Sequence, residues 1–477
     1  MNKFEKYNLD KSLTKALLLM DYIEPTEVQA QSIPVIKDHK DLLIKSETGS
    51  GKTAAFAIPI IDEVMWEENA PQVLVLTPTR ELAQQVSEEM FNIGRFKRMK
   101  VVSVFGKSPI KSQIKDLKQK THIVVGTPGR IFDHIKRGTL DLSKIKYLVL
   151  DEADEMLNMG FVDQIEEILS KIPKGFIMTL LSATLPDDLS KICNRYMNSP
   201  VIVEIEKTTT QKRIEQIRYD VPKKTKMDVL LDITVIENPD TCIIFCNTRL
   251  QVDEIFTSMK KAGYPCEKLH GGMEQDIRTK VMQNFRKRYF RYLIATDVAA
   301  RGIDIDDISL IINYDLPEEP QVYVHRIGRT GRKEKQGKAI SLVAGDSYLL
   351  KGITELTNNE LTKRFVPDKN LVESMRESFI EKINKKQEIR HEKHKELHQE
   401  IMKIHINVGK KTKMRAGDIV GALCNIEGMT KDDIGNISII DVSTFVEILN
   451  NKGEMVLRKL QDTPIKGRLR KVNRANE

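Results

Sequence analysis

The chain has 477 residues, of which 40% are hydrophobic and 30% are charged, with 76 Lys and Arg against 68 Asp and Glu. This composition supplies cores for about two to four domains and excludes a wholly disordered chain. No apolar run approaches the ~20 residues that span a bilayer, the first residues lack the apolar stretch of a secretory signal, and the five cysteines are scattered, so we predict a reduced, cytoplasmic protein with no membrane partner.

Short apolar runs alternate with amphipathic segments through most of the chain. The predicted strands are Val73–Leu76, His122–Val125, Tyr147–Leu150 and Ile177–Leu181, followed by Cys242–Phe245, Tyr292–Ala295, Leu310–Asn313 and Ala339–Val343. The predicted helices include Arg80–Gly94, Thr248–Ala262 and Gln275–Arg286. Such alternation is typical of parallel sheets covered by helices on both faces. We therefore predict two tandem α/β domains, residues 1–207 and 208–366, joined near Lys207–Arg213.

A glycine-rich segment, Ser46–Thr53, follows the apolar run Leu42–Ile44 and precedes a helical run. Backbone N–H groups of such a loop, together with the N-terminus of the next helix, bind phosphates. Lys52 is expected to reach the β- and γ-phosphates of a nucleotide, and Thr53 to ligate Mg²⁺. The segment therefore predicts a nucleotide-binding site in the first domain.

The acidic tetrapeptide Asp151–Asp154 closes the apolar run Tyr147–Leu150, so its carboxylates are expected at the C-terminal edge of a sheet, where ligands bind. Asp151 is predicted to hold Mg²⁺, directly or through water, and Glu152 to orient or deprotonate the attacking water. Taken alone, the tetrapeptide fits an acidic helix start equally well. The phosphate loop upstream favours the nucleotide interpretation.

A basic cluster, Tyr323–Arg332, places Arg326, Arg329 and Arg332 between glycines of the second domain. Guanidinium groups stabilise charge on a transferring phosphoryl group, and an arginine finger is worth ~10³–10⁵ in rate. Without a phosphate loop elsewhere, the cluster would read as an ordinary basic surface. With one, it predicts that the second domain completes the catalytic site.

The C-terminal part changes character. Residues 376–401 are dense in both charge signs and lack Gly and Pro, which predicts a solvated helix within a connector, residues 367–401. A strand at 403–408, a helix at Ala416–Cys424, strands at Ile434–Asp441 and Thr444–Ile448, a helix at Gly453–Leu460 and a strand at Ile465–Val472 then predict a βαββαβ domain, residues 402–477. This domain has 14 Lys and Arg against 9 Asp and Glu, which suggests a polyanionic partner.

From about Phe4 to Val366 these motifs resemble, in order and spacing, those of DEAD-box RNA helicases. The resemblance implies two RecA-like domains and the cofactors ATP and Mg²⁺. It implies catalytic roles for Lys52, Asp151 and Glu152, with Arg326 and Arg329 as arginine fingers, and a coupling role for Ser182, Thr184 and His325. The ATP-binding residues that it implies are Phe4, Tyr22, Thr26, Gln29, Ser46, Thr48, Gly49, Ser50, Gly51, Lys52, Thr53, Gly302 and Asp304. The RNA-binding residues are Pro78, Thr79, Arg80, Thr127, Arg130, Asn247, Gln275, Arg278, Thr296 and Asp297.

The end of the chain, notably Gly409–Asp418 and Ile465–Arg468, resembles the C-terminal domain of DbpA-type helicases. The resemblance implies a fold like the RNA-recognition motif (RRM-like) that recognises a hairpin of large-subunit ribosomal RNA. A standard RRM stacks bases on aromatic side chains, but residues 403–408 contain no Phe, Tyr or Trp, and Phe445 is predicted to pack in the core. We predict instead that basic side chains bind the RNA phosphates, with Lys466, Arg468 and Arg470 on one face of the final strand. The predicted residues are Lys410, Lys411, Lys413, Arg415, Lys466, Arg468 and Arg470.

The sequence thus predicts an RNA-dependent ATPase that unwinds RNA duplexes locally and non-processively. Its expected partners are ribosomal RNA and pre-ribosomal particles during large-subunit assembly. One alternative is an RNA clamp that acts in mRNA turnover or cold adaptation and rarely unwinds. Another is a DNA helicase or a general nucleotide hydrolase, but Gln29, the acidic tetrapeptide and the C-terminal domain argue against it, so no DNA partner is expected.

Overall fold

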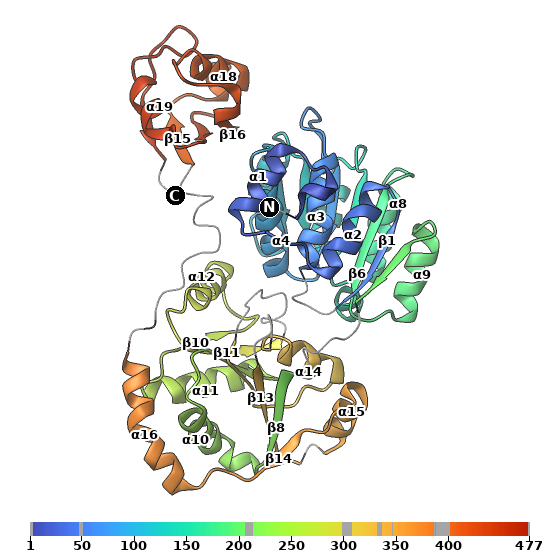
Figure 1. Cartoon of the computed structure of the whole chain (residues 1–477), viewed down its shortest axis with the longest axis vertical. Coiled ribbons are helices and arrows are strands. Elements are labelled where there is room, and N and C mark those ends of the chain that lie inside the picture. Colours follow the sequence, from blue (N-terminus) through green and yellow to red (C-terminus); the bar gives the residue numbers. More distant parts are fainter. Residues whose placement is uncertain are drawn as a thin grey trace.

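A computed structural model gives the fold for residues 3–46, 51–205, 213–297, 308–331, 336–345, 347–385, 387 and 401–475. These residues form three domains, each built on its own sheet (Figure 1). Among the helices so described, none has the length and apolar character needed to cross a membrane.

The first domain is a seven-stranded sheet in which every pair of neighbouring strands is parallel. Its strands, in spatial order, are β3 (Val101–Val104), β4 (Ile123–Gly126), β2 (Val73–Leu76), β5 (Tyr147–Leu150), β6 (Ile177–Ser182), β1 (Leu42–Lys45) and β7 (Val201–Glu204). Its helices are α1 (Lys11–Leu19), α2 (Glu27–Lys37), α3 (Lys52–Glu63), α4 (Arg80–Ile93), α5 (Ile110–Leu117), α6 (Pro128–Lys136), α7 (Ala153–Asn158), α8 (Val162–Lys171) and α9 (Asp187–Tyr196). Alternate residues of β2 belong to the two clusters of buried side chains, so both faces of the sheet are covered.

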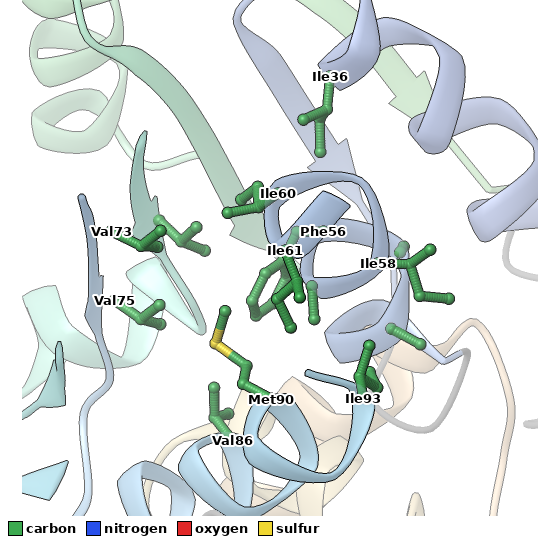
Figure 2. Packing of buried hydrophobic residues seen from close by; sticks show 14 of the residues in the cluster. Ile36, Phe56, Ile58, Ile60, Ile61, Val73, Val75, Val86, Met90 and Ile93 are labelled. Atoms are coloured by element: carbon green, nitrogen blue, oxygen red, sulfur yellow. The ribbon is translucent and has the colours of Figure 1, made fainter. Parts of the chain in front are cut away.

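Helix α3 lies in the middle of one face of this sheet (Figure 2). Phe56 is fully buried, and the helix faces Val73 and Val75 of β2 on one side and Met90 of α4 on another. Removing a large apolar side chain from water stabilises a fold by about 1.5–3 kcal/mol. Because α3 is anchored in this way, its first residue, Lys52, has a fixed position at the edge of the sheet.

The second domain is again a seven-stranded parallel sheet. Its strands, in spatial order, are β10 (Cys266–Leu269), β11 (Tyr292–Thr296), β9 (Cys242–Cys246), β12 (Leu310–Asn313), β13 (Gly337–Val343), β8 (Ile214–Asp220) and β14 (Thr362–Arg364). Its helices include α10 (Lys226–Glu237), α11 (Arg249–Lys261), α12 (Gln275–Arg286), α14 (Pro320–Ile327), α15 (Ser347–Thr357) and α16 (Lys369–Asn384). The two sheets confirm the predicted pair of α/β domains.

All eight predicted strands are present, and their ends differ from the prediction by one or two residues at most. The three predicted helices are α4, α11 and α12. Strand β1 matches the apolar run Leu42–Ile44, and strands β3, β7, β8, β10 and β14 were not predicted. The predicted joint between the domains, Lys207–Arg213, lies outside the described residues except for Arg213.

The segment from residue 376 begins as a largely exposed helix, as predicted, but this helix also packs on the second domain. Residues 376–384 belong to α16, which lies along α10 (Figure 1). Val372 and Phe379 are buried in the same cluster as Tyr264, and the rings of Phe379 and Tyr264 are 5.3 Å apart. Sparse apolar residues suffice here because one narrow stripe faces the domain. Beyond Lys385, the predicted connector lies outside the described residues apart from Gln387 and Ile401.

The C-terminal domain has the predicted βαββαβ order. It consists of β15 (Met402–Ile406), α18 (Ala416–Cys424), β16 (Ile434–Ile439), β17 (Thr444–Ile448), α19 (Gly453–Lys459) and β18 (Val472–Arg474). The spatial order is β16-β17-β15-β18, and all pairs are antiparallel. One face of this sheet packs on α18 and α19 around Ile404, Ile419, Val446 and Val456.

The predicted final strand, Ile465–Val472, is wrong. Ile465 and Arg468 pair with each other across a turn, in which Lys466 and Gly467 have φ angles of +54° and +74°. Left-handed residues end an extended strand, so β18 begins only at Val472. Lys466, Arg468 and Arg470 therefore do not share one face of a strand.

The other face of the C-terminal sheet lies against the first domain. Glu447 of β17 forms a nearly buried ion pair with Arg95, which follows α4, at 3.5 Å. On the same face the ring of Phe445 is half-buried and lies 5.0 Å from that of His405. The prediction that Phe445 packs in the core is therefore wrong, because the core side of β17 is formed by the alternate residues.

Candidate functional site

The predicted phosphate loop ends at the start of α3. Gly51 caps this helix with a φ of +86°, a left-handed conformation that glycine adopts at no steric cost. Lys52 is 9% exposed, and its Nζ donates a hydrogen bond to the backbone oxygen of Ser46 at 2.9 Å. The ammonium group is therefore held beside the residue that follows β1. Five predicted ATP-binding residues lie outside the described part of the chain: Thr48, Gly49, Ser50, Gly302 and Asp304.

Gln29 connects the predicted adenine site to this loop. Its side chain is 1% exposed, its Oε1 accepts from the backbone N–H of Thr26 at 3.0 Å, and its Nε2 donates to the backbone oxygen of Gly51 at 3.2 Å. A side chain on Gly51 would place its Cβ 2.7 Å from Gln29 Nε2. Because an amide nitrogen carries two protons, Gln29 can brace the loop and still donate to a base.

Tyr22 and Phe4 differ in what they can contact. Tyr22 is half-buried, and its hydroxyl donates to Glu89 Oε1 at 2.8 Å. Phe4 is fully buried, and its ring meets that of Tyr22 edge-on at 6.3 Å. In this structure Phe4 therefore supports Tyr22 from the core and presents no surface of its own to a ligand.

The acidic tetrapeptide follows β5, as predicted. Asp151 is 4% exposed, and burial raises its pKa to about 7, although nearby Lys52 acts in the opposite direction. A buried carboxylate in this position is stabilised by a bound cation. Thr53, half-buried in the first turn of α3, adds a hydroxyl oxygen, and carboxylate and hydroxyl oxygens suit Mg²⁺.

Glu152 has an unusual backbone conformation. Its φ and ψ are +50° and +53°, in the left-handed region, at the start of α7. A residue with a side chain costs of order 1–3 kcal/mol there, and such strain concentrates at functional sites. The conformation ends the strand abruptly, with Asp151 nearly buried and Glu152 half-buried at its edge.

Asp154 joins the tetrapeptide to the predicted coupling residues. Its Oδ2 accepts from the backbone N–H groups of Ala183 and Thr184, at 3.1 and 2.9 Å, and from Thr184 Oγ1 at 3.0 Å. Ser182 Oγ donates to the backbone oxygen of Thr184. The end of β6 is therefore tied to the acidic edge by one carboxylate oxygen.

In this structure Arg326, one of the two predicted arginine fingers, is bound within the second domain. Its side chain is nearly fully buried, and Nε and Nη2 donate to the two carboxylate oxygens of Asp297 at 2.5 and 2.7 Å. Nη1 donates to Asn313 Oδ1 and to the backbone oxygen of Asp315, and Nη2 also donates to Asn247 Oδ1 at 3.0 Å. A guanidinium group has five N–H donors, and all are used inside the second domain.

We expect Arg326→Ala to destabilise the second domain by roughly 3–5 kcal/mol, because it leaves Asp297 as a charge without its partner. The measurement is amide hydrogen exchange in β11 and β12 of the full chain. Arg364→Ala, which removes an exposed ion pair with Glu215, is the control and should change little. Unchanged exchange with a large loss of ATP hydrolysis would restore Arg326 as a finger.

Arg329 is the second predicted finger. It is 6% exposed and directly follows the end of α14, while Arg332 lies outside the described residues. Helix α14 reaches the first domain, because His325 Nδ1 lies 2.7 Å from Glu155 Oε1 in α7. This contact brings the basic segment of the second domain to the acidic edge of the first.

Predicted RNA-binding residues of the two domains also meet. Arg80 Nη1 donates to Gln275 Oε1 at 2.9 Å, and Arg278 forms an ion pair with Glu81 at 2.6 Å with both side chains nearly buried. Arg80 and Glu81 begin α4, and Gln275 begins α12. Two helix starts, one from each domain, are thus joined by polar side-chain contacts.

The other predicted RNA-binding residues of the α/β domains lie at the C-terminal edges of the two sheets, where ligands bind. Pro78 and Thr79 connect β2 to α4, and Thr127 and Arg130 lie at the start of α6 after β4. Asn247 follows β9, Thr296 ends β11, and Asp297 follows it. Arg130 is held by the backbone oxygen of Ser108 and by Gln113 Oε1, both at 3.0 Å.

The two basic segments of the C-terminal domain lie side by side. Lys466 Nζ donates to the backbone oxygen of Lys413 at 2.9 Å and lies 3.4 Å from Asp418. We call the resulting region the C-terminal basic surface. Its members are exposed apart from the half-buried Arg470, and they are Lys410, Lys411, Lys413, Arg415, Lys466, Arg468 and Arg470.

Sequence reasoning missed three residues of this site. Glu81 forms the ion pair with Arg278, Glu155 contacts His325, and Gln113 holds Arg130. Glu81 and Glu155 adjoin predicted motifs, so their position was a usable signal. Gln113 offered none, because its role depends on how α5 and α6 pack together.

Three family profiles match the chain. They are DEAD/DEAH box helicase over residues 26–192, Helicase conserved C-terminal domain over residues 190–334, and DbpA RNA binding domain over residues 403–474. Among curated proteins, the chain is 49% identical to the ATP-dependent RNA helicase DbpA of Bacillus subtilis (strain 168) over 479 residues, which is 100% of both chains. It is 45% identical to the DEAD-box ATP-dependent RNA helicase CshA of Geobacillus kaustophilus, over 72% of this chain and 74% of that protein.

Two solved structures that contain bound ligands are similar to this chain. The structure of S. cerevisiae Dbp5 bound to RNA and ADP BeF3 has a TM-score of 0.71 at 30% identity and covers 80% of this chain and 100% of its own. The structure of Mss116p bound to ssRNA and AMP-PNP has a TM-score of 0.70 at 27% identity and covers 80% of this chain and 82% of its own.

Proposed function

The chain belongs to the DEAD-box family of ATP-dependent RNA helicases and carries a DbpA-type RNA-binding domain, and on that premise we propose that it unwinds structured ribosomal RNA in the cytoplasm during assembly of the large ribosomal subunit. The observation that carries this proposal is the C-terminal basic surface, in which two sequence segments form one exposed cationic region. Clustered Lys and Arg side chains bind the phosphates of folded RNA.

The first domain would bind ATP between Gln29 and Lys52, with Asp151 and Thr53 holding Mg²⁺. This ion would supply positive charge to the phosphates. Glu152 would orient the attacking water and accept its proton while the water oxygen bonds to the γ-phosphorus and ADP leaves. The proposal is supported by the strained backbone of Glu152 and the burial of Asp151.

RNA would lie across both domains, along the starts of α4 and α12, which carry Arg80, Gln275 and Arg278. Contacts to its phosphates and 2′-hydroxyl groups would be independent of sequence. Because both ligands need the same closed arrangement, each would raise the affinity for the other. If only a bent single strand fits, closure on a duplex expels one strand and hydrolysis reopens the domains, which gives local, non-processive unwinding.

The C-terminal domain would select the RNA. Its open sheet face lies against the first domain through the Arg95–Glu447 ion pair, which favours the C-terminal basic surface over the sheet as the binding region. Binding there would raise the local concentration of neighbouring helices at the ATPase domains. Preference for a hairpin of large-subunit ribosomal RNA would then come from RNA shape and phosphate spacing.

We expect Lys411→Gln/Arg468→Gln to weaken binding of the preferred ribosomal fragment by about tenfold. The slope of log affinity against log salt concentration should become shallower by roughly 1.5–2. These two exposed residues represent the two segments of the basic surface. The measurement is RNA-stimulated ATP hydrolysis across a panel of ribosomal RNA fragments at several salt concentrations. At saturating RNA the turnover rate should remain near that of the unmodified chain.

The matched control is Arg458→Gln/Lys459→Gln, which removes two exposed charges from α19 in the same domain. If this control loses fragment preference and the first variant retains it, the targeting surface lies elsewhere. If ribosomal fragments stimulate no better than unrelated duplexes of equal length, ribosomal targeting is wrong while RNA-dependent hydrolysis stands. Displacement of a short duplex beside the hairpin distinguishes unwinding from clamping.

A further inference from the structure

We propose that Glu155, the residue directly after the acidic tetrapeptide, is a positioning residue that connects the nucleotide edge of the first domain to the RNA contacts of the second. Glu155 is 3% exposed in the first turn of α7, and its Oε1 lies 2.7 Å from His325 Nδ1 in α14. A carboxylate this deeply buried is costly unless it is paired. The pair therefore favours the arrangement in which the two domains are in contact.

On its own domain, Glu155 is joined to the residues that hold the end of β6. Its backbone N–H donates to Asp154 Oδ1 at 3.1 Å. The other oxygen of Asp154 accepts from the backbone N–H groups of Ala183 and Thr184. A shift of the β6 end would therefore move the first turn of α7 and the Glu155 carboxylate with it.

In the second domain, His325 is followed in α14 by Arg326, the buried residue whose guanidinium group donates to several side chains. Arg326 donates to Asp297 and to Asn247, both of which are predicted RNA contacts. A displacement of His325 would move the start of this network. The contacts thus form one chain from the acidic edge, through the Glu155–His325 pair, to the RNA side of the second domain.

Of the contacts between domains given above, the Glu155–His325 pair is the one that joins the acidic edge to the neighbour of Arg326. The contacts of Arg80 with Gln275 and of Glu81 with Arg278 also bridge the domains, but they lie at the starts of α4 and α12. A contiguous network is evidence of coupling only when perturbing it changes the equilibrium. The test must therefore measure the mutual effect of ATP and RNA rather than activity alone.

The experiment is a double-mutant cycle on the full chain with Glu155→Gln, His325→Asn and the pair of substitutions together. RNA affinity is measured with and without a non-hydrolysable ATP analogue, and the ratio is the coupling factor, commonly 5–150-fold. We expect each single substitution to lower this factor by about tenfold, and the double variant to lower it no further, because both remove the same contact. Affinity for the analogue without RNA should stay within about twofold.

Two further variants separate positioning from a structural role. Glu155→Asp keeps the carboxylate and should restore part of the coupling factor, whereas a merely structural role would not respond to charge. Glu166→Gln removes an exposed carboxylate of α8, 3.5 Å from Arg195, and should leave coupling unchanged.

The proposal is wrong if Glu155→Gln retains the coupling factor within twofold, or if the two single losses multiply in the double variant. It rests on the mutual dependence of ATP and RNA argued above. An unmodified chain without any coupling would overturn that mechanism together with this inference, whereas coupling that survives Glu155→Gln overturns this inference alone.

Discussion

Replacing Arg329 with alanine is expected to lower RNA-stimulated ATP hydrolysis by ~10³-fold or more. Arg329 follows α14, whose His325 contacts Glu155 in the first domain, so its segment lies at the acidic edge. Arg329 is nearly buried beside this edge, and a guanidinium group there can stabilise negative charge on the γ-phosphate. Its contribution is charge that stabilises the transition state, so the turnover rate should fall while ATP binding without RNA persists.

Steady-state hydrolysis at saturating RNA, together with ATP affinity by titration, is the measurement. Arg329→Lys should recover little, because an ammonium group lacks the planar donor geometry of a guanidinium group. Arg326→Ala supplies the comparison: it should perturb hydrogen exchange of the second domain, whereas Arg329→Ala should not. A loss under roughly tenfold would assign Arg329 a different role.

Most interior strands of both large sheets were predictable from the amino-acid sequence, whereas the edge strands and the interior strand β8 were not. Strands β2, β5 and β12 are buried along their whole length, and parallel strands covered on both faces are continuous apolar runs. Strands β3, β7, β10 and β14 are the outermost strands of the two sheets. The three residues of β14 are all exposed, so no apolar pattern marked that strand, and only its pairing with β8 defines it.

The candidate site divides in a similar way. Residues whose roles depend on a local segment, such as Lys52 at a helix start or Asp151 at a strand end, lie where their motifs predicted. The motif that contains Arg326 did not reveal that this side chain donates to Asp297 and Asn247. Those two residues are distant from Arg326 in the sequence and become its neighbours only in the folded sheet.

In the C-terminal domain, the prediction failed where a turn replaced a strand. Basic side chains stand at every second position from Lys466 to Arg470, which favours a strand. Pro464 and Gly467 favour a turn instead, and the structure has one. The basic residues nevertheless gather, because the turn places Lys466 against Lys413. Composition therefore predicted a cationic region correctly while the stated geometry of that region was wrong.

Replacing Glu152 with glutamine is expected to lower ATP hydrolysis by about 10²–10⁴-fold while ATP and RNA binding persist. Glutamine has nearly the shape of glutamate and suits the left-handed backbone of residue 152 no less well, so the fold of the edge should be kept. What is lost is the carboxylate that accepts a proton from the attacking water. Because closure needs binding and not hydrolysis, the variant should hold RNA in a long-lived complex with ATP.

Single-turnover hydrolysis and the dissociation rate of a labelled RNA with ATP present are the two measurements. The matched comparison is Glu155→Gln. It makes the same chemical change three residues after Glu152, but it removes a contact between the two domains. Glu152→Gln should slow the chemical step and stabilise the RNA complex, whereas Glu155→Gln should weaken that complex. Near-normal turnover in Glu152→Gln would mean that the water is activated by another group, and the strain at residue 152 would then need a structural explanation.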